Sequence, residues 1–291
     1  MGLDLRKLEH LVAVAEEGGF TRAAARLHLS QQALSTSVRS LEREVGVPLL
    51  RREATGVTPL PAGQALIDDA RVLHGAARAA LHRARRLGRG EVPVLSIGHT
   101  PAVTTDEVTA LVRTALAALP ELRTEVHQLY PPRLAERLRD GELGLGLCRG
   151  MRPGGGLTRS TLGQDRLAVA VAAGHRFARR EHVELAELAH ERLVVWGDPG
   201  RSGYTDLLLD HCRNAGFEPD HLRNPIQGTA PVTAVVGTGH VALVTGPPGP
   251  AVGGRVQVVE LRPALFAPLH ALWPTHVTDE VRDAVLTAVG G

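Results

Sequence analysis

The segment FTRAAARLHLSQQALSTSVRSLEREVGVPLLRR, residues 20–52, contains two consecutive helix signals. Thr21 is placed to cap a short helix, and Ser30 is placed to cap a longer helix that continues to about Glu44. Gly46 ends this second helix, because glycine readily adopts the left-handed conformation that follows a helix C-terminus. A short helix, a tight turn and a capped second helix predict a helix-turn-helix.

The second helix of this motif has two chemically different faces. Helical spacing predicts an apolar, buried face made of Ala33, Leu34, Val38, Leu41 and Val45. The opposite, polar face contains Gln31, Gln32, Ser35, Thr36 and Arg39. Glutamine can bond adenine edges and arginine can bond guanine edges, while hydroxyl groups reach bases or phosphates. A solvated amphipathic helix shows the same pattern, so the helix alone leaves both interpretations open.

A basic hairpin follows the second helix. Leu49-Leu50-Arg51-Arg52 leads into the turn Thr55-Gly56-Val57. A basic hairpin beside a recognition helix forms a wing that contacts phosphates or the adjacent minor groove, and this favours DNA binding. The candidate DNA-contacting residues are therefore Thr21, Ser30, Gln31, Gln32, Ser35, Thr36, Arg39, Arg51 and Arg52.

Residues 61–90 predict one long helix with a repeat of seven residues. The repeat places one series at Leu66, Leu73, Ala80 and Leu87, and a second series four positions later at Ala70, Ala77 and Ala84. An a/d seam of this kind favours a partner helix, and small alanines allow a close approach. These seven residues are the predicted dimerisation seam. The alternative is a helix that packs against its own domain.

Composition restricts the class of protein. The chain has 291 residues, which suits two or three domains, and its 43% hydrophobic and 22% charged residues are ordinary for a soluble globular protein. No apolar run approaches the roughly 18 residues of a membrane span, and the first nine residues lack the apolar region of a secretory signal. The two cysteines, Cys148 and Cys212, cannot form a disulfide framework, which predicts a cytoplasmic location. They are interpreted as buried thiols, with a redox switch as the alternative.

The small net charge of +2 is unevenly distributed. Residues 1–90 hold 14 Lys+Arg against 9 Asp+Glu, whereas residues 91–291 hold 19 against 22. Within the first part, residues 1–60 carry 8 basic against 7 acidic groups, so most of the excess lies on the long helix. DNA binding by residues 1–60 must therefore depend on a few placed groups and on dimeric avidity.

After residue 91 the pattern changes to short Val/Leu-rich strands that alternate with helices, which is typical of an α/β domain. We expect two interleaved lobes, with residues 92–161 and 266–291 in lobe I and about 162–265 in lobe II. The first strand of lobe II is expected at Leu167–Ala172. Two crossings between lobes predict a hinge and a cleft.

Several polar side chains lie at predicted strand ends and helix starts, where free N–H groups favour anions. These candidate ligand-binding residues are Thr100, Thr104, Arg149, Ser202 and Thr229. Arg149 could hold a carboxylate through two hydrogen bonds. The alternatives are helix caps for Ser202 and Thr229 and a salt bridge for Arg149. The hypothesis is a small anionic metabolite, such as an aromatic or other organic acid.

The sequence shows no pattern of an enzyme. The fourteen histidines include no H-x-x-x-H pair, there is no C-x-x-C, and the glycine-rich stretches lack the Gly-Lys-Ser/Thr of a phosphate loop. We therefore expect no catalytic site, no metal and no cofactor.

Residues 20–52, followed by GVTPLPAG at 56–63, resemble the DNA-binding domain of LysR-type transcriptional regulators. The matching positions run in the order of the family motif over about 60 residues: Ala23, Ala24, Leu27, Ser30, Gln31, Ala33, Leu34, Ser35, Val38, Leu41, Glu42, Gly46, Leu49, Arg52, Ala62 and Gly63.

Five positions depart from the family pattern. Gln32 stands where proline is usual, Thr36 where arginine is common, Leu50 where phenylalanine is usual and Leu60 where threonine is usual. Gly144 replaces an aspartate often found before a sensor strand. Because Gln32 and Thr36 belong to the presumed DNA face, the operator preference of a known relative does not carry over.

The resemblance implies an α+β multidomain chain. An N-terminal all-α winged helix-turn-helix (1–60) and a linker or dimerisation helix (61–90) would precede a C-terminal α/β two-lobed effector domain (91–291) that is like a type 2 periplasmic binding protein. The implied partners are double-stranded operator DNA, a small-molecule effector, a second copy of the chain as dimer or dimer of dimers, and RNA polymerase, with no membrane. The family also places a Ser or Thr where Thr100 stands. The alternative function is a sensor or enzyme whose helical N-terminus serves only for dimerisation.

Overall fold

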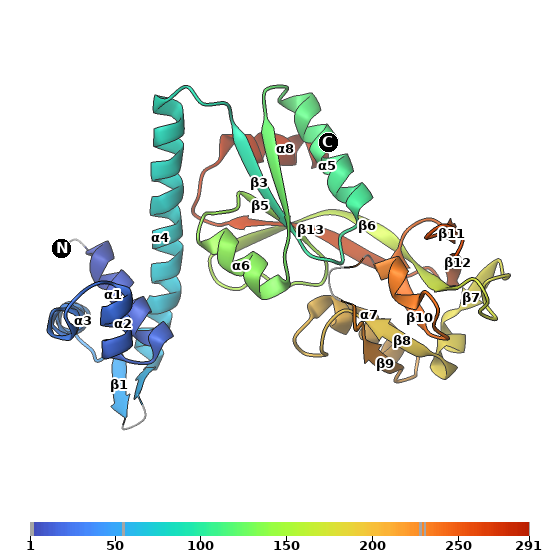
Figure 1. Cartoon of the computed structure of the whole chain (residues 1–291), viewed down its shortest axis with the longest axis horizontal. Helices are drawn as coiled ribbons and strands as arrows, with labels where there is room; N and C mark the ends of the chain where they lie inside the picture. Colours follow the sequence, from blue (N-terminus) through green and yellow to red (C-terminus); the bar gives the residue numbers. More distant parts are fainter. Residues whose placement is uncertain (1–2, 54–55, 227–228, 230, 291) are drawn as a thin grey trace.

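The computed structural model describes residues 3–53, 56–226, 229 and 231–290 (Figure 1). Thr55, which begins the predicted hairpin turn, lies outside these residues. A small helical domain sits at one end of a long helix, and a larger two-lobed domain lies beside that helix (Figure 1).

The helical domain contains α1 (Leu5–Glu17), α2 (Phe20–Arg26) and α3 (Gln31–Val45). Asp4 caps α1 by accepting from the Arg6 amide at 2.9 Å, and Gly18 ends it in the left-handed conformation. Ser30 caps α3, as predicted, by accepting from the Ala33 amide at 3.1 Å. The three helices enclose one apolar core that includes Leu8, Leu11, Leu34, Val38 and Leu41.

Two local predictions in this domain are wrong. Thr21 does not cap α2, because Gly19 takes the N-cap position in extended conformation and Thr21 lies exposed in the first turn. Ala33 and Val45 are exposed, since they lie near the two ends of α3 and beyond the reach of α1 and α2. Only the central part of the predicted apolar face is buried.

The wing and the long helix follow directly. Strands β1 (Leu50–Glu53) and β2 (Gly56–Pro59) pair antiparallel, and α4 extends from Pro61 to Gly88. Proline at the first helical position is favourable, since its missing N–H would have no partner there. Gly63 on α4 lies so close to Leu49 that a Cβ would come within 1.9 Å of the Leu49 carbonyl oxygen. The start of α4 is therefore fixed against the start of the wing.

Lobe I is built on three parallel strands in the order β4-β3-β5, with β13 and the first part of β6 added antiparallel. Its elements are β3 (Val94–His99), α5 (Thr105–Ala118), β4 (Arg123–Gln128), α6 (Pro131–Arg139), β5 (Leu145–Cys148), β13 (Phe266–Pro274) and α8 (Glu280–Gly290). The apolar residues of α5 and α8 pack with those of β3 and β5 in one core.

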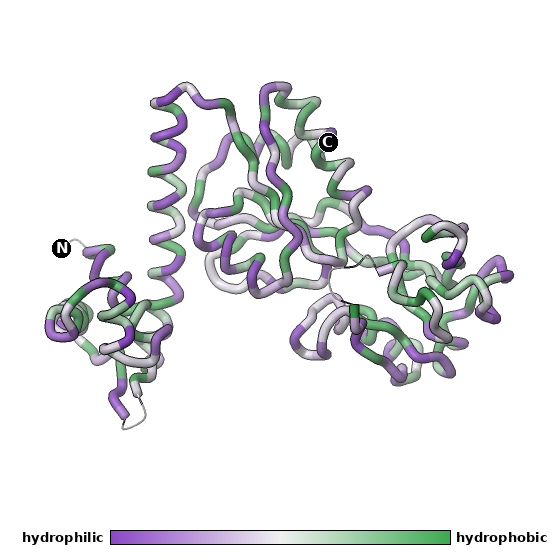
Figure 2. Tube along the Cα trace, viewed as in Figure 1, coloured by the Kyte–Doolittle hydropathy of each residue, from purple (hydrophilic) through white to green (hydrophobic). Residues whose placement is uncertain are grey.

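Lobe II contains the second part of β6 between β10 and β12. Its elements are β7 (His182–Glu184), the 3-10 helix η1 (Leu185–His190), β8 (Arg192–Val195), α7 (Gly203–Asn214), β9 (Asp220–Arg223), the 3-10 helix η2 (Pro231–Val235), β10 (Val241–Thr245), β11 (Gly249–Ala251) and β12 (Val256–Arg262). Apolar residues follow the strands of both lobes, whereas α4 alternates polar and apolar residues along its length (Figure 2).

Strand β6 (Leu157–Ala172) joins the lobes. It pairs with β13 as far as Arg166 and with β10 from Leu167 onward. The sequence predicted only the part from Leu167, because the preceding residues are mostly polar and lack an apolar alternation; in the structure most of them are exposed. The chain returns through β13, so two neighbouring strands form the predicted hinge.

Within the part of the chain that the structure describes, no helix combines the length and apolar character needed to cross a bilayer.

Candidate DNA-binding face and effector cleft

The polar face of α3 is open to solvent. Gln31, Gln32, Thr36 and Arg39 are exposed and Ser35 is half-buried, while Leu34, Val38 and Leu41 on the other side are at most 1% exposed. The Thr36 hydroxyl donates to the Gln32 carbonyl at 2.9 Å, so its oxygen can still accept from a ligand. This arrangement can place side chains against base edges in a major groove.

Arg52 connects the wing to the recognition helix. Its guanidinium donates to Ser35 Oγ at 3.1 Å and lies 4.5 Å from the centre of the Phe20 ring. Arg51 is exposed and pairs with Glu53 at 2.8 Å. Two arginines therefore stand beside the exposed face of α3, one fixed in position and one extending into solvent.

Ser30 and Thr21 differ in whether their hydroxyl groups are available for a DNA contact. The Ser30 oxygen is occupied by its cap of α3, so its first role is structural. Thr21 is exposed on α2.

The two lobes enclose a cleft of about 900 Å³. Residues from both lobes line it, including Thr100, Tyr130, Arg139, Met151, Trp196, Ser202, Asn224, Ile226 and Thr229. At its base the lobes touch, because a Cβ on Gly203 would come within 2.0 Å of the Gly150 carbonyl oxygen. The cleft predicted between lobes is present.

Three buried polar atoms on this lining lack a hydrogen-bond partner among the described residues: Thr100 Oγ1 and Arg149 Nε from lobe I and Trp196 Nε1 from lobe II. Thr100 is 3% exposed, and its amide donates to the Leu147 carbonyl at 3.0 Å, which fixes the loop after β3. A buried donor without a partner is costly, so a ligand that supplies acceptors to both lobes would be stabilised here.

Arg149 is not the free anion clamp that the sequence predicts. Its side chain is fully buried, its Nη2 donates to Glu107 and Asp165, and its Nη1 donates to the Ala267 carbonyl. These partners come from α5, β6 and β13, so Arg149 joins lobe I to both hinge strands. Two carboxylates already neutralise it, and the salt-bridge alternative is the one observed.

Thr104 also lies elsewhere than expected. It caps α5 in a reciprocal box with Glu107, whose carboxylate accepts from the Thr104 amide at 2.7 Å. Thr104 lines a separate hollow beside β6, β10 and β12 and not the cleft.

Ser202 and Thr229 both line the cleft while making local hydrogen bonds. Ser202 caps α7 by accepting from the Thr205 amide at 3.3 Å. Thr229 donates to the Ile226 carbonyl at 3.1 Å and is 3.4 Å from Asn224 Nδ2. The cap alternative therefore holds for Ser202, and both residues remain at the cleft surface.

Sequence reasoning missed most of the cleft. Three arginines on its lining, Arg139, Arg152 and Arg201, and the aromatic residues Tyr130 and Trp196 were not singled out. Trp196 follows β8 directly, and a large side chain at the carboxyl end of a parallel strand was the available signal. The others come from loops and a short helix whose placement depends on the fold.

The predicted dimerisation seam divides into two parts. Ala70 is fully buried and Leu66 half-buried in the core of the chain's own helical domain, so Ala70 is corrected to a core residue. The remaining seam residues are exposed along the C-terminal part of α4: Leu73, Ala77, Ala80, Ala84 and Leu87.

We expect both thiols to resist modification in the folded protein. Burial raises the pKa of Cys148 to about 12 and that of Cys212 to about 11, so little reactive thiolate exists at neutral pH. Thiol labelling at pH 8 should give fewer than one modified cysteine per folded chain and two after denaturation. Rapid labelling of the folded chain would contradict this prediction and reopen the redox alternative.

Among the described residues, no group of three or more His, Cys, Asp or Glu side chains is arranged to hold a metal ion.

A winged helix-turn-helix joined by a long helix to a two-lobed domain with a cleft defines the class of ligand-responsive transcriptional regulators. Residues 5–64 match the family description "Bacterial regulatory helix-turn-helix protein, lysR family", and residues 88–285 match "LysR substrate binding domain". The chain belongs to the LysR family of transcriptional regulators.

Two curated relatives illustrate the match. The HTH-type transcriptional regulator TfdS of Cupriavidus pinatubonensis is 35% identical over 219 residues, which cover 75% of this chain and 74% of that protein. The uncharacterized HTH-type transcriptional regulator YnfL of Escherichia coli is 29% identical over 286 residues, which cover 95% of this chain and 94% of that protein. These relatives are regulators, so the prediction of a non-enzymatic protein is confirmed.

The fold matches a solved structure of the same family. The crystal structure of CbnR has a TM-score of 0.62 at 23% identity and covers 99% of this chain and 98% of its own. CbnR has also been solved in complex with its target DNA. The predicted family and fold class are confirmed.

Proposed function

We propose that this chain binds operator DNA as a dimer and changes its DNA binding when a small anionic metabolite occupies the cleft between the lobes. The observation that carries the proposal is the combination, in one chain, of an exposed polar recognition face and a cleft between two lobes, on whose lining buried polar atoms lack a partner among the described residues. An enzyme, or a sensor without a DNA role, leaves the helix-turn-helix and its basic wing unexplained.

The DNA-binding part of the proposal rests on α3 and the wing. Gln31, Gln32 and Arg39 are exposed on α3 for base contacts, and Arg51 and Arg52 lie on the wing for phosphate contacts. The solved complex of CbnR with its target DNA supports the same use of this domain. A roughly palindromic operator would follow from a two-fold symmetric dimer.

Dimerisation would use the exposed C-terminal part of α4. Leu73 and Leu87 are 42% and 70% exposed, and the alanines between them leave room for a second helix. Two DNA-binding domains on one dimer would compensate for the small charge of residues 1–60 through avidity. A dimer bound at a promoter would also contact RNA polymerase, which is the further partner of this proposal.

The effector would be an anion that enters between α7 and the arginines of the cleft. The N-terminus of α7 follows Ser202 at the cleft surface, and its free N–H groups favour negative charge. Arg139, Arg152 and Arg201 also line the cleft, whereas Arg149 is neutralised within the hinge. Thr100 and Trp196 would hydrogen-bond the ligand from opposite lobes.

A gel shift with the DNA upstream of the chain's own gene tests the DNA-binding function. The full-length protein is expected to shift this fragment at low salt and to prefer it over unrelated DNA. No shift at low salt would refute the regulator function. Calorimetry of the full-length protein with benzoate, succinate and acetate, and with benzamide and succinamide, tests the effector class. Binding of neutral compounds only would refute an anionic effector.

Replacing Gln31 with alanine should weaken operator binding by about 1–3 kcal/mol per protomer, because a base-edge contact is lost. Non-specific affinity should change little, since Gln31 carries no charge. Gel-shift titrations with operator and unrelated DNA measure both values. An equal loss on both fragments would show that Gln31 does not read sequence.

Replacing Arg52 with alanine should weaken binding to all DNA sequences and reduce the slope of log affinity against log salt by about 1. The structure adds a second reason, because Arg52 also holds the wing against Ser35 and Phe20. Arg52→Lys keeps the charge and loses the planar contact, so it should retain the salt slope. An unchanged slope in Arg52→Ala would refute the phosphate contact.

A further inference from the structure

Helix α6 borders both the effector cleft and the long helix α4. Tyr130, which precedes α6, and Pro131, Ala135 and Arg139 line the cleft. The same helix packs against α4 on its other side, and its last residue is followed by Asp140 at that contact. One nine-residue helix thus contacts both the ligand site and the element that carries the DNA-binding domain, and Figure 1 shows it beside α4.

The contact between α4 and the two-lobed domain depends on glycine residues. A Cβ on Gly75 of α4 would come within 1.7 Å of the Arg139 carbonyl oxygen, which no backbone atom could accommodate without moving. A Cβ on Gly141 would come within 2.8 Å of the Gly75 carbonyl oxygen, and one on Gly156 within 2.2 Å of Val72 Cγ2. Three glycines therefore allow helix and sensor to approach more closely than side chains would permit.

Arg139 contacts both the cleft and α4. Its side chain lines the cleft and donates from Nε to the Gly155 carbonyl at 2.9 Å, while its own carbonyl faces Gly75. A shift of α6 upon ligand binding would therefore move the surface on which α4 rests.

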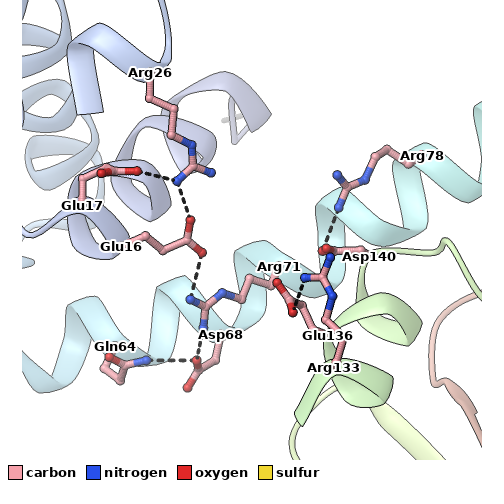
Figure 3. A network of polar contacts seen from close by, with 10 residues as sticks. All are labelled: Glu16, Glu17, Arg26, Gln64, Asp68, Arg71, Arg78, Arg133, Glu136 and Asp140. Carbon is pink, nitrogen blue, oxygen red and sulfur yellow. Dashed lines mark hydrogen bonds and ion pairs between the residues drawn. The ribbon is translucent and has the colours of Figure 1, made fainter. Parts of the chain in front are cut away.

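Ion pairs continue the connection toward the helical domain (Figure 3). Arg78 of α4 donates to Asp140 at 2.8 Å, which fixes α4 to the end of α6. Arg71, two turns earlier on α4, donates to Glu16 of α1 at 3.0 Å, and Arg26 of α2 donates to the same carboxylate at 2.9 Å. Partial burial opposes ionisation of Glu16, but the hydrogen bonds from Arg26 and Arg71 prevail and lower its pKa.

We infer that α6 transmits the state of the effector cleft to the DNA-binding domain through the glycine contact of Gly75 with Arg139 and the Arg78–Asp140 ion pair. The inference rests on the proposed function and adds how its ligand site regulates DNA binding. Coupling between two sites requires an element whose position both sites influence, and α6 meets that requirement.

Gly75→Ala tests the contact directly, because its methyl group forces α4 away from Arg139. Gly88→Ala is the matched control, since Gly88 lies on the same helix and no described residue comes within 4 Å of its Cβ position. For each full-length variant, affinity for the upstream DNA fragment is measured with and without the tightest-binding acid among benzoate, succinate and acetate. Calorimetry measures affinity for that acid.

The wild-type chain and Gly88→Ala should show a ligand-induced change in DNA affinity within the 5–150-fold range typical of coupled sites. In Gly75→Ala this factor should fall to within twofold of 1, while ligand affinity and DNA affinity without ligand stay within about threefold of wild type. A full response in Gly75→Ala overturns the inference and leaves the proposed function intact. If no acid binds the wild-type chain, the proposed effector function fails and the coupling fails with it.

A charge reversal provides a second test in case Gly75→Ala does not fold. Arg78→Glu should reduce the ligand response by up to about fivefold, as expected for an exposed pair. The double variant Arg78→Glu/Asp140→Arg should restore it. Equal responses in the single and double variants would count against the ion pair as part of the route.

Discussion

Arg149→Ala is expected to destabilise the two-lobed domain by about 3–5 kcal/mol, because removing one partner of a buried ion pair leaves the other charges uncompensated. The Arg149 side chain is fully buried, and its loss would leave the carboxylates of Glu107 and Asp165 facing each other at the hinge. The Glu107 side chain is 18% exposed and that of Asp165 is 42% exposed, so the water that reaches Asp165 places the loss toward the lower end of this range. Chemical denaturation of the full-length chain, followed by tryptophan fluorescence, measures the loss, since Trp196 and Trp273 belong to opposite lobes.

Arg152→Ala is the matched control for this prediction. Arg152 also lines the cleft, but it is exposed, so its removal should change stability by less than about 0.5 kcal/mol. If the two variants are equally stable, Arg149 does not hold the hinge. Arg149→Ala/Glu107→Gln leaves the same cavity as Arg149→Ala but removes one carboxylate charge, so a partial recovery of stability would show that the unpaired carboxylates contribute to the loss.

Gly63→Ala is expected to destabilise the helical domain by about 1–3 kcal/mol, although alanine is the better helix former by about 1 kcal/mol. The added methyl group would lie 1.9 Å from the Leu49 carbonyl oxygen and 2.8 Å from its carbon. That carbonyl accepts a hydrogen bond from the Leu60 amide at 2.9 Å, and the Leu49 side chain is fully buried. Neither the carbonyl nor the side chain can move without disturbing the wing.

The same change should also weaken DNA binding, since it displaces β1 and with it Arg51 and Arg52. Thermal unfolding and a gel shift measure the two effects. Gly88→Ala, at the open end of the same helix, should be neutral or slightly stabilising. A Gly63→Ala protein that is as stable as wild type would mean that the wing can shift away from α4 without cost.

Gly63 and Gly75 also show what the sequence could and could not predict. Gly63 was recognised as part of the family motif, but its physical role depends on the proximity of Leu49, which is 14 positions earlier. Gly75 was not singled out, because it interrupts no helix and its neighbour Arg139 is distant in the chain. Steric need for glycine inside a helix becomes visible only when the opposing backbone is known.

The helical domain was predicted well where short-range rules apply. Ser30 caps α3 and Gly46 ends it, because a cap is a hydrogen bond between residues three apart and a left-handed terminus depends on one residue. The N-cap of α2 was wrongly assigned to Thr21. Gly19 and Thr21 are both acceptable N-caps, so local preference does not decide between them. The interior of α3 followed its periodicity, and only its ends did not.

By itself the sequence determined the helix-turn-helix, the capped recognition helix with its polar face, and the change to an α/β pattern after residue 91. These follow from periodicity, caps and turns, which act within a few residues. Only the tertiary structure decided that Arg149 is neutralised by Glu107 and Asp165, that Ala70 belongs to a core, and that α6 contacts both the cleft and α4. Burial and charge pairing depend on residues brought together from distant parts of the chain, so no local pattern contains them.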